Sequence, residues 1–241
     1  MATDAQRVKA QGADAPLDLW TRLTAEPGET RCVVLTGSGT RAFCAGGDLK
    51  ERDGMSNAEW MAQHLIYERM IRAVIDCPVP VIAAVNGAAY GGGCELAAGA
   101  DFIYAADNAR FALTETSLGI IPGAGGTQTL ARAIGERRAK ELIMAARPFS
   151  AAEALEWGLV NAVLPQAQLL EETLQTAQTI ASNAPVAVRQ ARQAIQRGLQ
   201  MSLADGLAFE IEAYNRTIPT NDRREGVRAF VEKRVPEFKG D

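Results

Sequence analysis

Two β-rich runs on either side of one helical run constrain the fold of this chain most. The runs at residues 32–36 and 79–86 are each followed by a glycine, which is typical of strands that end in turns. Between them, residues 57–76 carry apolar side chains at helical spacing. This order predicts parallel strands with a right-handed crossover, and it places the loops that follow the strands at one edge of the sheet. We therefore predict an α/β fold.

The second half of the chain is almost purely helical in its pattern. Short strands are predicted at 102–106 and 109–113, and helices at 127–134, 137–146, 151–158, 167–182, 185–198, 202–216 and 222–232. Ser150 and Glu153 form a capping-box pattern at the start of one of these helices. We divide the chain into an atypical N-terminal segment (1–30), an α/β core (31–180) and a C-terminal helical region (181–241).

Composition and charge restrict the class of protein. The chain has 241 residues, of which 47% are hydrophobic and 22% are charged, as in a soluble protein with a full core. A formal net charge of −4 argues against a nucleic-acid surface built on bulk charge. The apolar stretch at 78–85 is too short to span a bilayer, and the N-terminus lacks the pattern of a secretory or organelle leader. We expect a cytoplasmic protein that binds neither nucleic acid nor membrane.

Metal-binding and nucleophilic side chains are few. The cysteines are scattered without C-x-x-C spacing: Cys32, Cys44, Cys77 and Cys94. His64 is the only histidine, so we expect no metal site, and a Ser-His-Asp triad could be built only around this residue. The cysteines are predicted to be small buried residues in a reducing compartment. His64 lies in the predicted helix 57–76, and we interpret it as a helix-surface residue.

Two glutamates stand beside glycine-rich turns in otherwise apolar segments. Glu95 follows the triplet 91–93 and should lie in the first turn of a buried helix, whereas Glu115 precedes the turn at 118–123. Burial raises the pKa of a carboxyl group towards the range that is useful for proton transfer. Two such groups near one substrate can share acid and base roles. The alternative for Glu115 is a structural carboxylate that caps the turn directly after it.

The segments 45–48 and 91–93 are rich in glycine. Without side chains, their backbone N–H groups are open to close approach by a ligand. Two such groups aimed at one point would form an oxyanion hole, to which the dipole of the helix carrying Glu95 would add. Tight turns or close helix packing are the alternative interpretation. The carboxylate two residues after the triplet, and the second acid downstream, favour the functional interpretation.

Four sequence strings occur in one order along the chain. They are AFCAGGDLK at 42–50, PVIAAVNG at 80–87, GGGCEL at 91–96 and IPGAGGTQ at 121–128. Together they resemble the motifs of the enoyl-CoA hydratase/isomerase family, the crotonases, and the resemblance extends over residues 31–239. It implies a spiral of β-β-α units, a C-terminal helical region used for oligomerisation and CoA contact, and an acyl-CoA substrate.

The resemblance assigns catalytic roles residue by residue. The N–H groups of Gly47 and Gly92 would hold the thioester oxygen as it gains enolate charge. Glu95 and Glu115 would position and deprotonate the water that attacks C3 and deliver a proton to C2. Gly123 would support the water site. No metal or redox cofactor is implied, because CoA is part of the substrate.

The resemblance also implies contacts with the acyl group and with CoA. The residues concerned are Ala45, Gly46, Asp48, Leu49, Lys50, Arg52, Phe230 and Lys233. Lys233 resembles the lysine that meets the CoA phosphates, often from a neighbouring subunit, and a point charge suits that task. The alternative for Lys233 is a solvated helix charge. The resemblance further implies a homotrimer, or a homohexamer built as a dimer of trimers.

The presence of both glutamates favours hydration. Family members that only shift a double bond commonly replace one of the two glutamates. Δ3-Δ2 enoyl-CoA isomerisation is therefore kept only as an alternative to hydration. Four strings are more similar to the methylglutaconyl-CoA hydratases of leucine breakdown than to general short-chain enoyl-CoA hydratases; they lie at 43–52, 139–143, 185–187 and 218–223. A general short-chain enoyl-CoA hydratase is the second alternative. The methylglutaconyl substrate carries a free carboxylate, which Arg52 could bind. Alternatively, Arg52 is a surface side chain paired with Glu51 or Asp53.

Two non-enzymatic alternatives can be weighed on the same residues. A relative of the methylglutaconyl-CoA hydratases also binds RNA, through a lysine-rich helix ahead of its first motif. The corresponding stretch here, 17–29, has Arg22 as its only cation, so we do not expect RNA binding. A catalytically silent homologue is the other alternative, against which the two intact glutamates argue.

The N-terminus departs from the family pattern. Crotonases begin with a β-hairpin, whereas residues 1–16 are polar and rich in alanine, and we predict no strands there. The first family hairpin would then be missing or replaced. One sheet edge would be exposed and the affinity for CoA reduced.

Overall fold

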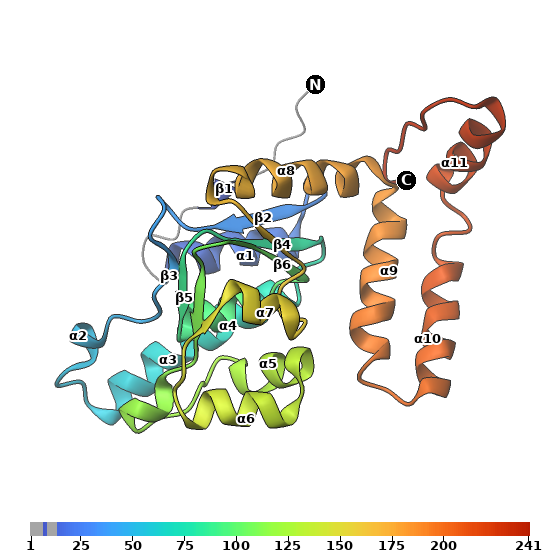
Figure 1. The fold of residues 1–241 in the computed structure, drawn as a ribbon. Helices are drawn as coiled ribbons and strands as arrows, with labels where there is room; N and C mark the ends of the chain where they lie inside the picture. Colours follow the sequence, from blue (N-terminus) through green and yellow to red (C-terminus); the bar gives the residue numbers. More distant parts are fainter. Residues whose placement is uncertain (1–6, 9–13) are drawn as a thin grey trace.

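The larger of two sheets is parallel and has the strand order β1-β2-β4-β6-β9 (Figure 1). The computed structural model describes residues 7–8 and 14–241. The strands of this sheet are β1 (Arg7–Val8), β2 (Val33–Thr36), β4 (Val81–Val85), β6 (Phe102–Ala106) and β9 (Ala162–Leu164). All of β4 is buried and it pairs on both sides, as expected for a strand that is apolar on both faces.

A second sheet has the strand order β3-β5-β7-β8. Its strands are β3 (Ala42–Cys44), β5 (Ala88–Tyr90), β7 (Arg110–Ala112) and β8 (Phe149–Ser150). Each of β2, β4 and β6 is followed along the chain by a strand of this second sheet. Asn86 fixes one passage between the sheets, because its Nδ2 donates to the carbonyl oxygens of Gly37 and Gly39 at 3.2 and 2.7 Å. This is the predicted spiral of β-β-α units.

Helices cover the sheets and fill the space between them. They are α1 (Asp14–Ala25), α2 (Leu49–Arg52), α3 (Asn57–Ile75), α4 (Gly92–Ala98), α5 (Gly126–Ile134), α6 (Glu136–Met144), α7 (Ala151–Glu156) and α8 (Gln166–Ser182), with a 3-10 turn η1 (Glu115–Leu118). α8 packs on β2, β4 and β6, while α4 packs between β3, β5 and β6. The residues at 93–97 in α4 are buried, so this helix is internal, as predicted. In the described part of the chain no helix is long and apolar enough to cross a membrane.

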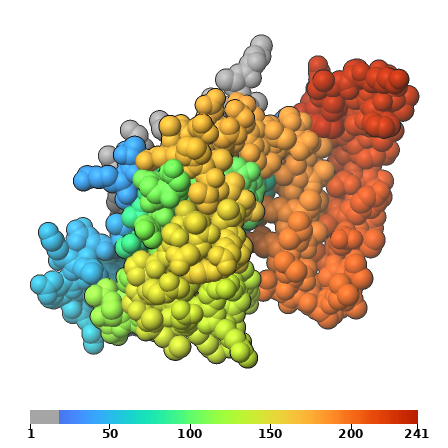
Figure 2. Space-filling model, in the orientation of Figure 1, coloured from blue at the N-terminus to red at the C-terminus, as the bar shows by residue number. Residues whose placement is uncertain are grey.

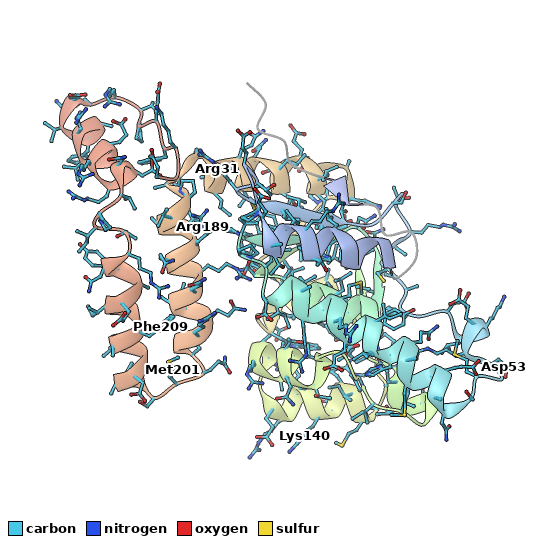
Figure 3. All side chains as sticks on the ribbon, turned by 180° about the vertical axis from the view of Figure 1, so that it is seen from behind. Arg31, Asp53, Lys140, Arg189, Met201 and Phe209 are labelled. Atoms are coloured by element: carbon cyan, nitrogen blue, oxygen red, sulfur yellow. The ribbon has the colours of Figure 1, made fainter. Side chains whose placement is uncertain are left out.

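The last three helices form what we call the C-terminal arm: α9 (Pro185–Gly198), α10 (Leu203–Asn215) and α11 (Asn221–Glu232). Figures 1 and 2 show this arm beside the core, and Figure 3 labels Met201 and Phe209 on it. Arg192 of α9 anchors the arm, because its Nε donates to both carboxylate oxygens of Asp101 at 2.7 and 2.8 Å. Its Nη2 also donates to the carbonyl oxygen of Ile75 at 2.8 Å.

The predicted α/β class and most of the predicted elements are confirmed. α9 has the predicted bounds, and the capping box of Ser150 and Glu153 is present. The sequence missed β3, β5, β8 and β9, because runs of two or three residues show no usable periodicity. The division of the chain at residues 30 and 180 stays a prediction.

The prediction of a strand-free N-terminus is wrong at residues 7–8. β1 pairs in parallel with β2, with Arg7 opposite Val34 and Val8 opposite Leu35. The edge of β2 is therefore paired at Val34 and Leu35. Among the described residues, no second strand completes an N-terminal hairpin with β1, and the rest of the segment, 1–6 and 9–13, lies outside them.

Candidate active site

A pocket of about 170 Å³ lies where the loops of the second sheet meet α3, α4 and η1. It is lined by most of the predicted site residues: Ala45, Gly46, Gly47, Leu49, Arg52, Gly92, Glu95, Glu115 and Gly123. The fold brings them together because β3, β5 and β7 are parallel neighbours. Segments that follow the carboxyl ends of parallel strands meet at one edge of the sheet.

Glu95 is held in place by two backbone amides. It lies in the first turn of α4 and is only 4% exposed. Its Oε1 accepts hydrogen bonds from the N–H groups of Ala124 and Gly126, both at 2.8 Å. A Cβ at position 126 would lie 3.0 Å from this oxygen, so glycine at that position lets the loop approach the carboxylate. The second oxygen of Glu95 is left for other partners.

Glu115 has an unusual environment for a carboxylate. Its Oε2 is buried and has no hydrogen-bond partner among the described residues. Burial raises the pKa of the Glu115 carboxyl; its own backbone opposes this rise, and the nearby Glu95 charge adds to it. The following turn is closed by Ser117, whose N–H and Oγ both donate to the Thr114 carbonyl. This closure does not involve the Glu115 carboxylate, and the alternative that Glu115 caps the turn stays a prediction.

The two glycine-rich segments lie against each other in the wall of the pocket. A Cβ on Gly46, whose φ is +89°, would lie 2.9 Å from the carbonyl oxygen of Tyr90 and 3.4 Å from the amide nitrogen of Gly92. Gly47 and Gly92 both line the pocket. The close packing of these segments therefore depends on glycine, and the oxyanion hole formed by their N–H groups stays a prediction.

Arg52 lies at the end of α2, facing aromatic side chains. Its guanidinium is 4.5 Å from the centre of the Trp60 ring and 5.5 Å from that of Tyr67, and its Nε donates to Gln63 Oε1 at 2.8 Å. Among the described residues no carboxylate forms an ion pair with it. The alternative that Arg52 pairs with Glu51 or Asp53 is therefore wrong. Asp53, labelled in Figure 3, lies at the outer end of this segment.

Comparison with known proteins agrees with this geometry. A family model described as enoyl-CoA hydratase/isomerase matches residues 21–241. The chain belongs to the enoyl-CoA hydratase/isomerase family. It shares its fold with the crystal structure of enoyl-CoA hydratase from Bacillus anthracis, at a TM-score of 0.92 and 49% identity, over 95% of this chain and 88% of that one. The predicted family, fold and enzyme class are confirmed.

Two curated relatives of this hydratase/isomerase are equally similar and differ in the substrate that they are named for. Short-chain-enoyl-CoA hydratase of Clostridium acetobutylicum is 44% identical, over 86% of this chain and 79% of the relative. Human mitochondrial methylglutaconyl-CoA hydratase is also 44% identical, over 88% of this chain and 64% of the relative. Overall identity therefore does not choose between the two acyl groups.

One face of α3 completes the hydratase/isomerase pocket and was missed by sequence reasoning. His64 and Tyr67 line this pocket, and Trp60 and His64 line an adjoining apolar pocket of about 890 Å³. His64 is partly exposed on the helix surface, as interpreted, but its Nε2 also lies 3.2 Å from the carbonyl oxygen of Gly123. The spacing of 60, 64 and 67 places these side chains on one helix face, and that signal could have identified them.

Four predicted contact residues do not line the candidate pocket. Asp48 caps α2, since its Oδ1 accepts from the Lys50 N–H at 2.9 Å, and Lys50 is exposed. Phe230 and Lys233 lie on the C-terminal arm, where Phe230 is 86% exposed. A single chain of this hydratase/isomerase therefore does not bring Phe230 and Lys233 to the pocket.

The cysteines are placed largely as predicted. Cys32, Cys77 and Cys94 are buried free thiols, whereas Cys44 is partly exposed. Burial raises the pKa of Cys32 to about 12. A buried thiol of this kind is protonated at neutral pH and behaves as a small apolar side chain.

Proposed function

We propose that this chain is a hydratase that adds water reversibly across the double bond of an α,β-unsaturated acyl-CoA. The observation that carries the proposal is the pair of unlike carboxylates in one pocket. Glu95 is fixed by two amides, while Glu115 has a buried oxygen without a partner. Two carboxyl groups with different environments are suited to hold one water and to divide the proton transfers.

The proposed reaction balances without a cofactor. The water oxygen bonds to C3 as one of its O–H bonds breaks, and the proton is taken up by a carboxylate. The electrons of the double bond move towards the thioester oxygen, which the N–H groups of Gly47 and Gly92 stabilise. A carboxyl group of the glutamate pair then releases a proton to C2, which restores the charge of the pair, and the thioester carbonyl re-forms. Loss of one donor of this kind typically lowers the rate about 10²- to 10³-fold.

Hydration is tested by the loss of enoyl-thioester absorbance. We expect the purified protein to remove this absorbance from crotonyl-CoA or 3-methylglutaconyl-CoA and to form the 3-hydroxyacyl-CoA, identified by mass. Conversion of a 3-enoyl-CoA to a 2-enoyl-CoA without hydration would instead support the isomerase alternative. No reaction with any of these thioesters would contradict the proposal and favour a silent homologue.

For the acyl group, we propose 3-methylglutaconyl-CoA, which would place the enzyme in leucine breakdown. The support is the position of Arg52, whose Nη2 lies 3.5 Å from the point that a Cβ on Gly47 would occupy. Gly47 is the proposed thioester oxyanion donor, and the two carboxyl carbons of a five-carbon diacid lie roughly 5 Å apart. A guanidinium this close to Gly47 can reach the distal carboxylate of a substrate whose thioester oxygen is held there, and can pair with it in a bidentate manner.

Replacing Arg52 tests this assignment. We expect Arg52→Met to lower kcat/KM for 3-methylglutaconyl-CoA about 10- to 100-fold, since a hydrogen bond to a charged group contributes about 1.5–3 kcal/mol. The value for crotonyl-CoA should change little. Arg69→Met, at an exposed position of α3, removes the same charge away from the pocket and serves as the control. An unchanged ratio of the two substrates in Arg52→Met would contradict the role of Arg52.

For the assembly, we propose a trimer or a dimer of trimers in which the C-terminal arm meets a neighbouring copy. The arm exposes large apolar side chains, which include Leu203, Tyr214, Phe230 and Val231, and Val235 directly after it is exposed as well. Exposed apolar area of this kind usually marks an interaction surface. Phe230 and Lys233 would then reach the CoA of the neighbouring subunit. CoA enters as part of the substrate, and we propose no separate cofactor.

A further inference from the structure

His64 is the one histidine of the sequence, and the proposed reaction does not use it. Its Nε2 lies 3.2 Å from the carbonyl oxygen of Gly123. The ring packs so closely on that residue that a Cβ at position 123 would lie 2.8 Å from Nε2. Glycine at 123 thus permits the contact.

The peptide group that His64 meets also holds Glu95. The carbonyl oxygen of Gly123 and the N–H of Ala124 belong to the same peptide group. The oxygen side of this group faces His64 Nε2, and the N–H side donates to Glu95 Oε1 at 2.8 Å. One planar unit therefore joins the histidine to the carboxylate.

A carbonyl oxygen only accepts hydrogen bonds, so Nε2 must carry the hydrogen in this contact. A donor at the carbonyl polarises the peptide group and strengthens the bond that its N–H makes, by about 10–30% in a chain of hydrogen bonds. The same contact fixes the orientation of the peptide plane. Both effects act on the position of the Glu95 carboxylate.

We propose that His64 is a positioning residue for Glu95, acting by donation from Nε2 to the Gly123 carbonyl. The proposal rests on the proposed role of Glu95 for its effect on rate, but its structural part can be measured without turnover. The readouts are the tautomer of the ring and the Ala124 amide. A residue that merely fills space would not require one particular nitrogen to donate.

The tautomer is tested first, in the intact protein labelled with ¹⁵N-histidine. A single histidine gives one imidazole, so the signals need no assignment. At a pH where the ring is neutral, we expect the hydrogen on Nε2 and none on Nδ1. The opposite tautomer would overturn the proposal, since Nε2 could not donate to Gly123.

Two amide variants then separate the two ring nitrogens. The side-chain NH₂ of His64→Gln can reach the place of Nε2, whereas that of His64→Asn reaches only the place of Nδ1. We expect His64→Asn to lower kcat about 10- to 100-fold, as displacement of a catalytic group does, with KM changed less than about twofold. His64→Gln should restore most of kcat.

The resonance of the Ala124 amide proton compares the same two variants without an assay of enzyme activity. We expect its resonance to move upfield in His64→Asn, because its bond to Glu95 weakens, and to stay near the native position in His64→Gln. Thermal unfolding checks that both variants fold. The proposal is overturned if His64→Asn keeps the native kcat and Ala124 resonance, or if His64→Gln loses as much as His64→Asn. If the native protein hydrates nothing, only the proposed function fails, and the tautomer and resonance still decide the role of His64.

Discussion

Glu115→Gln is expected to lower kcat for hydration on the order of 10³-fold, within the range known for loss of a positioned acid or base. Glutamine matches the shape of the side chain but cannot exchange the proton. KM should change little, because the thioester contacts proposed for Gly47 and Gly92 are retained. The measurement is kcat and KM from the loss of enoyl-thioester absorbance, for whichever acyl group the native protein prefers.

The same variant should be at least as stable as the native protein at neutral pH. Burial raises the pKa of the Glu115 carboxyl above its ordinary value of 4.5, so the fold favours the protonated form. The stability that this proton contributes is present below that ordinary value and is lost as the pH rises through the higher folded-state pKa. Glutamine removes the cost of the buried charge. A loss of activity together with an unchanged or higher Tm is therefore the expected pair of results.

The control for Glu115→Gln is Glu156→Gln, which changes an exposed glutamate of α7. It should leave kcat and Tm as in the native protein. If Glu115→Gln retained more than about a tenth of native kcat, Glu115 would not be the acid or base, because such groups contribute at least about 10²-fold. A strongly lowered Tm in this variant would contradict the view that its Oε2 is buried without a partner.

The part of the candidate site that holds the two glutamates could be predicted from sequence, because local patterns encode it. Glu95 and Glu115 stand out as charges in apolar segments, and the glycines at 46 and 92 mark backbone that must be approached closely. These signals lie within short strings whose geometry is nearly fixed by the turns they form. The structure then adds what these strings cannot encode, namely the unequal partners of the two carboxylates.

The side of the candidate site formed by Arg52 and α3 could not be predicted in the same way, because long-range packing decides it. For Arg52 the sequence left two interpretations open, a pocket residue that binds a carboxylate and a local ion pair with an acidic neighbour, and only the structure shows its guanidinium facing Trp60 and Tyr67 of another helix. His64 lies on α3, where the apolar spacing defined the buried face and left the pocket face looking like ordinary surface. The short strands β3 and β5 likewise form through pairing with partners distant in sequence.

Gly93→Ala is expected to destabilise the folded protein by more than about 4 kcal/mol, and soluble protein should be scarce. A Cβ at this position would collide with the carbonyl oxygen of Cys44 and would lie 2.6 Å from its carbonyl carbon. This backbone cannot move away easily, because β3 pairs with β5 through Cys44 and Ala89. The free energy of unfolding in urea, or the soluble yield, measures the effect.

The neighbouring glycine provides the matched control. A Cβ on Gly92 would meet nothing closer than the Cα of Gly46 at 3.9 Å, so Gly92→Ala should fold with nearly native stability. A folded Gly93→Ala protein with the native midpoint of unfolding in urea would show that the end of β3 does not pack tightly against α4. That contact sets the distance between the segments of Gly47 and Gly92, and their amides could not converge on one thioester oxygen without it. The tight packing at Gly93 is thus a structural condition for the proposed chemistry, although Gly93 itself touches no substrate.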